Sequence, residues 1–349
     1  MKQKRRITIH QVADEANVSR QTVSRVINNR PDVAPETRRR VLEVIERLGY
    51  QPSAIARSLI QQRSYTIGIV TAGLKYIGPS RTLNGITKMA EEMGYGLLLK
   101  ELHGFKTNNV DPLLQWFLSR QVDGIIWAVP EVGENRDWLK DQLPDLPVPL
   151  IFLTMRLQEG LSIVSVDNYL GGRMATEHLI EQGKRNIGHL SGPLDWWEAR
   201  QRKKGWLDAL RDADMEAGDE CSSEGNWSSR SGEKAFRQLL GQYPNMDAVF
   251  VGNDQMALSV IQIACQDGIK IPDELAIVGF DGIPDSAYYW PPLTTVNQDQ
   301  YRLGFTAVQT LVETIEAWQQ GETDLEPKTV IIEPELSIRE STVSTNQPD

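Results

Sequence analysis

The sequence predicts an α/β protein in which a small helix-turn-helix unit precedes a larger body of two doubly wound parallel sheets. Three observations support this prediction. Residues 9–28 read as two short amphipathic helices separated by a tight turn. From residue 65 onward, short apolar strands alternate with amphipathic helices in two successive series, which is the pattern of βαβ units. The charge divides at the same place: residues 1–63 carry 13 Lys/Arg and 6 Asp/Glu, whereas the remaining residues carry 24 and 41.

Local signals mark the ends of the helices in the small unit. Thr8 and Gln11 have the spacing of a capping box, so the first helix is expected to begin after Thr8. Ser19 closes the turn and can cap the second helix with its hydroxyl group. Pro35 suits the first position of a third helix, and Gly49 suits its end.

The outward face of the second helix is polar and basic, which suits a reader of the DNA major groove. Arginine and glutamine carry forked donors that match the edges of guanine and adenine. A plain three-helix bundle with a solvated arginine face is the alternative, but the basic charge of this unit against an acidic body favours DNA. The candidate DNA contacts here are Thr8, Ser19, Arg20, Gln21, Thr22, Ser24, Arg25 and Asn28.

A short stretch, residues 53–59, connects the two parts of the chain. Ser53 can cap it, and Ala56 and Leu59 belong to its small apolar stripe. It is too short to be helical in water by itself. If it becomes helical only on DNA, Leu59 could enter the minor groove as a wedge between base steps. An ordinary flexible tether is the alternative.

Aromatic and polar side chains follow several predicted strands of the body. Parallel sheets bind ligands outside the carboxyl ends of their strands. Indole rings stack on the apolar faces of sugars, and Arg, Asn and Asp fix hydroxyl groups. Core packing, surface ion pairs and helix capping are the alternative roles. The residues in question are Pro79, Trp196, Arg200, Trp227, Asn253 and Asp281.

Several classes of protein are disfavoured. The sequence has no GxxxxGK[ST], GxGxxG or GxSxG motif, and its four histidines and two cysteines lack metal-ligand spacing. We therefore expect no enzymatic activity, no cofactor and no metal. No apolar run is long enough to span a membrane, and the basic N-terminus is not followed by an apolar segment. We expect a cytoplasmic protein without a membrane partner.

In its motifs the chain resembles the LacI/GalR family of transcriptional repressors, and the pattern is closest to the lactose-repressor branch. The resemblance covers nearly the whole chain and is clearest in residues 22–28, 253–257, 278–281 and 291–296. It implies a homodimer that binds a palindromic operator in double-stranded DNA and controls carbohydrate-utilisation genes. A small sugar would act as the inducer. It also implies a periplasmic-binding-protein-like body of two lobes joined by three crossovers.

The resemblance also implies roles for individual residues. Arg20, Gln21 and Arg25 would read bases, and Leu59 would enter the minor groove. The implied effector contacts are Tyr76, Pro79, Thr154, Trp196, Arg200, Trp227, Asn253, Asp281 and Gln298. Thr154 stands where the lactose-repressor branch has an aspartate, and the extra indole surface favours a disaccharide or glycoside. A purine or other small metabolite acting as a corepressor is the alternative.

These interpretations predict four segments. They are a DNA-binding unit (1–52), a hinge helix and linker (53–63), a two-lobed body (64–340) and a disordered tail (341–349). The first lobe is expected to comprise about 64–164 and 296–324, and the second about 165–295 and 325–340.

Overall fold

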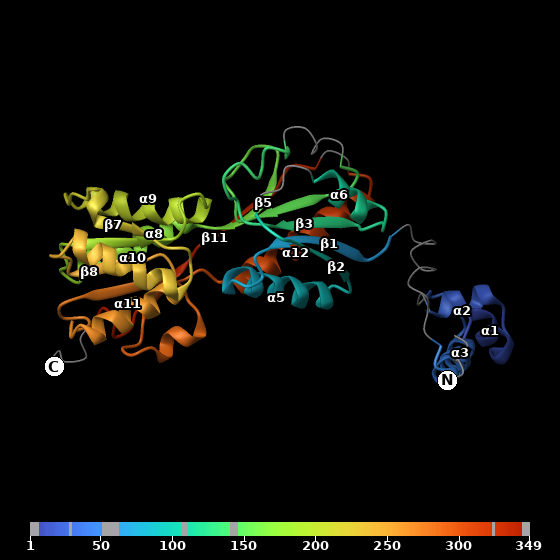
Figure 1. The fold of residues 1–349 in the computed structure, drawn as a ribbon. Helices are drawn as coiled ribbons and strands as arrows, with labels where there is room; N and C mark the ends of the chain where they lie inside the picture. The colour runs from blue at the N-terminus through green and yellow to red at the C-terminus, as the bar shows by residue number, and fades with distance from the viewer. Residues whose placement is uncertain are drawn as a thin grey trace. The chain divides into compact units, whose positions relative to one another are not determined.

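The computed structural model describes residues 7–27, 30–50, 63–105, 110–139, 146–322 and 325–343. The chain separates into two compact units, residues 1–65 and residues 66–349 (Figure 1). Four of the candidate DNA contacts, Asn28, Ser53, Ala56 and Leu59, lie outside the described residues, as does nearly all of the predicted hinge segment.

The first unit contains the predicted helix-turn-helix. Its helices are α1 (Ile9–Ala16), α2 (Arg20–Ile27) and α3 (Pro35–Leu48). The capping box is present, because the Thr8 side chain accepts from the Gln11 backbone N–H and the Gln11 side chain accepts from the Thr8 backbone N–H. Gly49 ends α3 in the left-handed conformation, at φ 63°. Val12, Val23 and Val41 are fully buried where the three helices meet, so this small core holds α2 in place.

The first lobe of the second unit is built on a parallel sheet with strand order β11-β5-β4-β3-β1-β2. The strands are β1 (Thr66–Ala72), β2 (Gly96–Leu102), β3 (Gly124–Ala128), β4 (Leu150–Leu153), β5 (Ser162–Val166) and β11 (Thr329–Ile332). The helices are α5 (Ile77–Glu92), α6 (Asp111–Leu118) and α12 (Gln300–Gln319). The sheet is buried between them: Trp127 and Phe152 of the sheet and Phe117 of α6 are among the largest buried side chains of this lobe.

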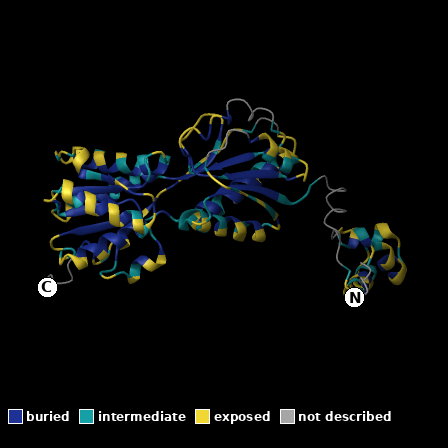
Figure 2. Cartoon of the chain, in the orientation of Figure 1, coloured by how far each residue is buried: buried dark blue, intermediate teal, exposed yellow. Residues whose placement is uncertain are grey.

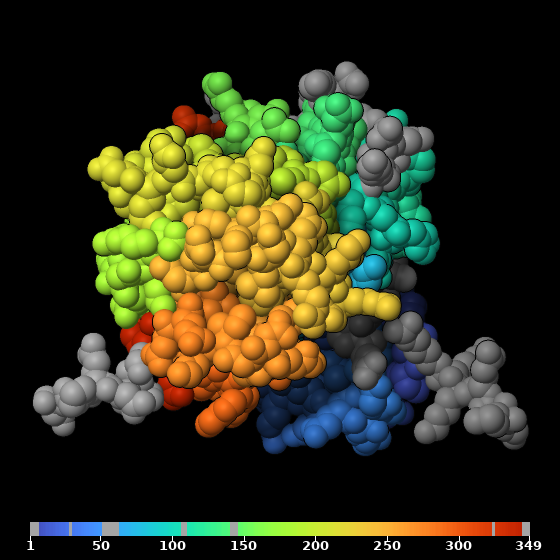
Figure 3. Space-filling view, turned by 60° about the vertical axis from the view of Figure 1, so that its left-hand side comes forward, coloured from blue at the N-terminus to red at the C-terminus, as the bar shows by residue number. Residues whose placement is uncertain are grey.

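The second lobe repeats this plan with strand order β12-β10-β9-β8-β6-β7, in which only β12 runs antiparallel to its neighbour. The strands are β6 (Ile187–Ser191), β7 (Ser222–Glu224), β8 (Ala248–Val251), β9 (Ala276–Asp281), β10 (Thr294–Asn297) and β12 (Glu335–Ser337). The helices are α8 (Asn168–Glu181), α9 (Trp197–Asp212), α10 (Ser229–Gln242) and α11 (Asp254–Gln266). Burial is greatest along the strands of both lobes (Figure 2), and helical residues cover the near face of the second lobe in the space-filling view (Figure 3).

The chain crosses between the lobes three times, after β5, after β10 and after β11. The third crossing lies later than predicted. Residues 329–332 pair with β5, in the register Thr329↔Ile163, and so belong to the first lobe. The predicted start of the tail is also wrong, because Ser341 and Thr342 are buried in the second lobe and the Ser341 hydroxyl donates to the Ile277 carbonyl at 2.6 Å.

Facing glycines bring α8 and α9 into direct backbone contact. A Cβ atom added to Gly172 would lie 2.4 Å from the Arg202 carbonyl oxygen, and one added to Gly205 would lie 2.3 Å from the Tyr169 carbonyl oxygen. Gly85 and Gly304 make the same kind of contact between α5 and α12 in the first lobe. Moving either backbone would disturb a whole helix, so the contacts at Gly172 and Gly205 fix the position of α9 against α8.

We expect Gly205→Ala to lower the free energy of unfolding of the body by about 1–3 kcal/mol, because the added methyl group forces α8 and α9 apart. Gly241→Ala is the matched control, since its Cβ would have nothing within 4 Å. That change should stabilise α10 by up to about 1 kcal/mol through helix propensity alone. Urea unfolding of both variants tests this, and a Gly205→Ala protein as stable as the Gly241→Ala protein would contradict close packing of α8 on α9.

Candidate functional site

The first candidate site is the outward face of α2. Ser19 caps this helix, because its hydroxyl oxygen accepts from the Thr22 backbone N–H at 3.1 Å. Arg20, Gln21 and Arg25 are exposed on the helix. Arg20 Nη1 lies 3.1 Å from His10 Nε2, and the Arg25 guanidinium lies 3.4 Å from the Asp32 carboxylate. These contacts are at the surface, so both arginines can turn toward a DNA partner.

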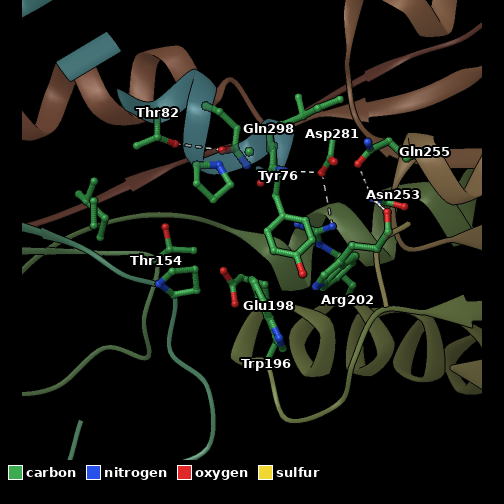
Figure 4. Close-up of a pocket in the computed structure, with 18 residues that line it drawn as sticks. Tyr76, Thr82, Thr154, Trp196, Glu198, Arg202, Asn253, Gln255, Asp281 and Gln298 are labelled. Carbon is green, nitrogen blue, oxygen red and sulfur yellow. Dashed lines mark hydrogen bonds and ion pairs between the residues drawn. The ribbon is translucent and has the colours of Figure 1, made fainter. Parts of the chain in front are cut away.

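The second candidate site is a cleft between the two lobes of the body (Figure 4). Its lining comes from residues at or beyond the carboxyl ends of β1, β3, β4, β6, β7, β8, β9 and β10. Parallel strands place these ends at one edge of each sheet, which explains how residues far apart in the sequence meet. The structure brings together eight of the nine predicted effector residues, namely Tyr76, Pro79, Thr154, Trp196, Trp227, Asn253, Asp281 and Gln298.

The ninth, Arg200, lies elsewhere. It borders a separate depression with Lys203 and Arg211, and its Nη1 donates to the Leu194 carbonyl at 2.9 Å. The arginine that lines the cleft is Arg202. Two residues turn an α-helix through about 200°, so Arg200 and Arg202 point to opposite sides of α9. The spacing of Glu198, Arg202 and Gly205 on the buried face of α9 is the sequence signal that identifies the correct arginine.

Arg202 is only 5% exposed, and its hydrogen bonds join several elements of the second lobe. Its Nε donates to Asn168 Oδ1 at 2.8 Å, and its Nη1 donates to the Gly252 carbonyl and lies 3.5 Å from Asp281 Oδ1. The guanidinium stacks on the Phe280 ring, 3.8 Å from its centroid. Burial raises the pKa of Asp281, and the nearby Arg202 charge opposes that rise. The two side chains therefore form one buried, mutually compensating pair.

Gln298 and Asn253 complete the polar end of the cleft. Gln298 Nε2 donates to Asp281 Oδ1 at 2.6 Å, which orients the carboxylate. Asn253 Oδ1 accepts from the Met256 backbone N–H at the start of α11, and its Nδ2 donates to the Trp227 carbonyl at 3.0 Å. The Asn253 amide thus holds the loop that carries Trp227.

Aromatic rings form a wall beside this polar end, where the Arg202 guanidinium lies 5.3 Å from the centroid of the Trp227 ring. Trp196 meets Tyr76 and Trp227 edge-on, with ring centroids 6.0 and 5.7 Å apart. It also lies 4.7 Å from Phe105, so a second-lobe indole packs against two first-lobe rings. Gly192 makes room for the Trp227 ring, since an added Cβ would lie 2.0 Å from Cη2. The result is a rigid apolar wall beside a cluster of hydrogen-bonding groups.

Main-chain hydrogen bonds join the two lobes beside Trp196. The Trp197 N–H donates to the Glu131 carbonyl, and the Gly133 N–H donates to the Asp195 carbonyl, each at 3.0 Å. We refer to these paired segments, residues 131–133 and 195–197, as the clasp. Both segments adjoin the cleft, because Pro130 and Trp196 belong to its lining.

Glu198 also lines the cleft and has no counterpart in the sequence predictions. It is 7% exposed, and burial raises the pKa of its carboxyl group to about 7. In Figure 4 this carboxyl group points between Thr154 and Tyr76. Nothing in the sequence marks it, because a glutamate in the first turn of a helix is usually a solvated residue near the positive end of the helix dipole.

Within the described ranges, no group of three or more His, Cys, Asp or Glu side chains could hold a metal ion. No helix in the same part of the chain is long and apolar enough to cross a membrane.

Comparisons with known proteins cover both parts of the chain. Residues 8–53 match the family model of bacterial regulatory proteins, lacI family, and residues 176–342 match the periplasmic binding protein-like domain. Catabolite control protein A of Priestia megaterium is 35% identical, over 88% of this chain and 92% of its own length. The transcriptional repressor PurR of Mannheimia succiniciproducens is 33% identical, over 96% of this chain and 98% of its own.

Solved structures of transcriptional regulators are similar to this chain over nearly its whole length. A complex of the transcriptional regulator CelR with cellobiose superposes with a TM-score of 0.70 at 32% identity, covering 96% of this chain and all of that one. A Lac repressor dimer bound to operator and the anti-inducer ONPF superposes with a TM-score of 0.84 at 29% identity, covering 97% of this chain and all of that one.

Proposed function

Since the chain belongs to the lacI family of bacterial regulatory proteins and is a DNA-binding transcriptional regulator, we propose that it is a sugar-released repressor. A dimer would place two copies of α2 in the major groove of a palindromic operator. A small sugar, a disaccharide or glycoside, would occupy the cleft and weaken that binding. Genes for carbohydrate use would be the controlled set.

The observation that supports a sugar most directly is the position of the aromatic wall beside the Arg202–Asp281 pair. The apolar face of a pyranose ring fits against indole rings, and its hydroxyl groups require paired donors and acceptors. Trp196 and Trp227 supply the first, while Asp281 and Gln298 supply the second. The solved CelR complex contains cellobiose, a neutral disaccharide.

The cleft also suits coupling to DNA. Tyr76 and Thr154 come from the first lobe, and Trp227 and Asp281 come from the second. A ligand that touches both lobes binds one arrangement of them more tightly than another, and can shift the equilibrium by that difference in affinity. A coupling free energy of about 1–3 kcal/mol, typical of allosteric proteins, would lower operator affinity by roughly 5- to 150-fold.

A thermal-shift screen against mono- and disaccharides and purine bases tests this proposal. We expect a neutral disaccharide to raise the melting temperature by mass action, and Trp227→Ala to remove that shift. A DNA site for the measurement can be selected from a random pool with the full-length protein. The same sugar should weaken binding of the protein to that site. If only a purine binds, and it strengthens DNA binding, the protein is a corepressor-dependent regulator and the sugar proposal fails.

A further inference from the structure

Two buried polar atoms in the cleft lack hydrogen-bond partners. Glu198 Oε2 and Trp227 Nε1 are both inaccessible to solvent and unpaired, and both residues line the cleft. Among the other unpaired buried side-chain atoms of the described residues, none belongs to a residue of this lining. Leaving a buried polar group unsatisfied costs about 1–3 kcal/mol, so such a group in a native protein calls for a partner.

The two atoms have complementary chemistry. The indole N–H can only donate, and an ionised carboxylate oxygen can only accept. Trp196 adjoins both residues: its ring packs edge-on against Trp227, and its backbone lies two positions before Glu198. One unpaired acceptor, one unpaired donor and an apolar ring therefore belong to the lining of the same cleft. A sugar ring with its hydroxyl groups can satisfy contacts of these kinds.

The charges of the cleft indicate which sugars fit. The ionisable side chains on its described lining, apart from Tyr76, are Glu198, Arg202 and Asp281. The Arg202 charge is compensated by Asp281 and by its bonds to Asn168 and Gly252. Glu198 is the charged side chain of this described lining that keeps an unpaired buried oxygen, although Arg202 and Arg136 favour its ionised form. A phosphate or carboxylate beside that oxygen would be repelled in a poorly solvated site.

We propose that Glu198 selects uncharged sugars, an inference that rests on the proposed function. Its carboxylate accepts a hydrogen bond from a sugar hydroxyl group, while the Trp227 indole donates to a sugar oxygen. The same carboxylate excludes phosphorylated and carboxylated sugars. Glu198 thereby supplies a hydrogen-bond acceptor on the second lobe, near Thr154 of the first lobe. The Thr154 hydroxyl group is a weaker acceptor than the Glu198 carboxylate.

Other charged groups around Glu198 set the pH at which it acts. Arg202, on the same helix, and Arg136, from the first lobe, favour its ionised form, whereas Glu131 disfavours it. Glu131 is itself paired with Arg156, at 2.7 Å. Because the ionised carboxylate is the acceptor, affinity for an uncharged sugar should rise about five- to tenfold from pH 6 to pH 8.

Calorimetric titration of the full-length protein with cellobiose, glucose, glucose 6-phosphate and glucuronic acid tests the proposal. We expect the wild type to bind an uncharged sugar at least tenfold more tightly than a charged one. Glu198→Gln should narrow that preference to less than threefold and flatten the pH dependence. Without sugar, Glu198→Gln should melt no lower than the wild type at pH 8, which shows that the variant is folded.

The outcomes separate the two proposals. If uncharged sugars bind and Glu198→Gln keeps the full preference and pH dependence, selection by Glu198 is overturned while the sugar-released repressor stands. If a charged sugar binds the wild type more tightly, selection by Glu198 is likewise overturned. If none of the four probes binds but a purine does, both proposals fall.

Discussion

Arg202→Ala is expected to abolish the response to sugar, whereas Arg200→Ala is expected to leave it intact. Removing Arg202 leaves Asp281 as a buried charge without its partner and frees the Asn168 and Gly252 oxygens. Breaking a buried ion pair in this way costs about 3–5 kcal/mol. Urea unfolding should show this loss for the body, and calorimetry should show no sugar binding.

The first unit has its own core, so Arg202→Ala should still bind DNA and should fail to release it when sugar is added. Arg200→Ala is the matched control, because it lies on the same helix two residues away and donates only to the Leu194 carbonyl in the described structure. Arg202→Lys should recover part of the stability, since it restores the charge without the fork of donors. A normal sugar response in Arg202→Ala, with its loss in Arg200→Ala, would refute the assignment of the pocket arginine.

Gln21→Ala is expected to reduce specific DNA binding by about 1–3 kcal/mol for each copy of α2, because a base contact read by a forked side chain contributes that much discrimination. Gln21 is exposed, so its removal should leave the helix-turn-helix folded. Fluorescence anisotropy with a selected site and a scrambled site, over a range of salt concentrations, provides the measurement.

The loss of affinity in Gln21→Ala should be confined to the selected site. The slope of log affinity against log salt concentration should stay unchanged, because no phosphate contact is removed. Arg39→Ala is the control: Arg39 lies on α3 in an exposed pair with Glu43. Arg39→Ala should weaken binding to the selected and the scrambled site equally, or leave both unchanged. Equal weakening of the two sites by Gln21→Ala would show that this residue does not read bases.

Features determined by neighbouring residues could be predicted from the sequence. The capping box at Thr8, the cap at Ser19 and the end of α3 at Gly49 each depend on a few adjacent positions, and all three are confirmed. The carboxyl ends of the apolar strands likewise located most of the cleft. This worked because parallel sheets gather those ends at one edge.

Features that depend on long-range packing could not be predicted. The start of α9 at Trp197 is stabilised by a backbone bond to Glu131 in the other lobe, a partner that no local pattern contains. The strand 329–332 is short and half exposed, and only its pairing with β5 assigns it to the first lobe. The buried carboxylate of Glu198 depends on several packed elements at once, so no local pattern reveals it.

The clasp makes this scaffold suited to redesign as a sensor. Its two bonds use only main-chain atoms of Glu131, Gly133, Asp195 and Trp197, so they survive a change of side chain at neighbouring positions. A library that randomises Trp196 and Glu198 would alter ligand recognition while keeping the backbone contact between the two lobes. Proline at position 197, the first residue of α9, would remove an N–H from the clasp at a helix position that accepts proline. Such variants should still bind their ligands, but the expression of a linked reporter gene should no longer change when ligand is added.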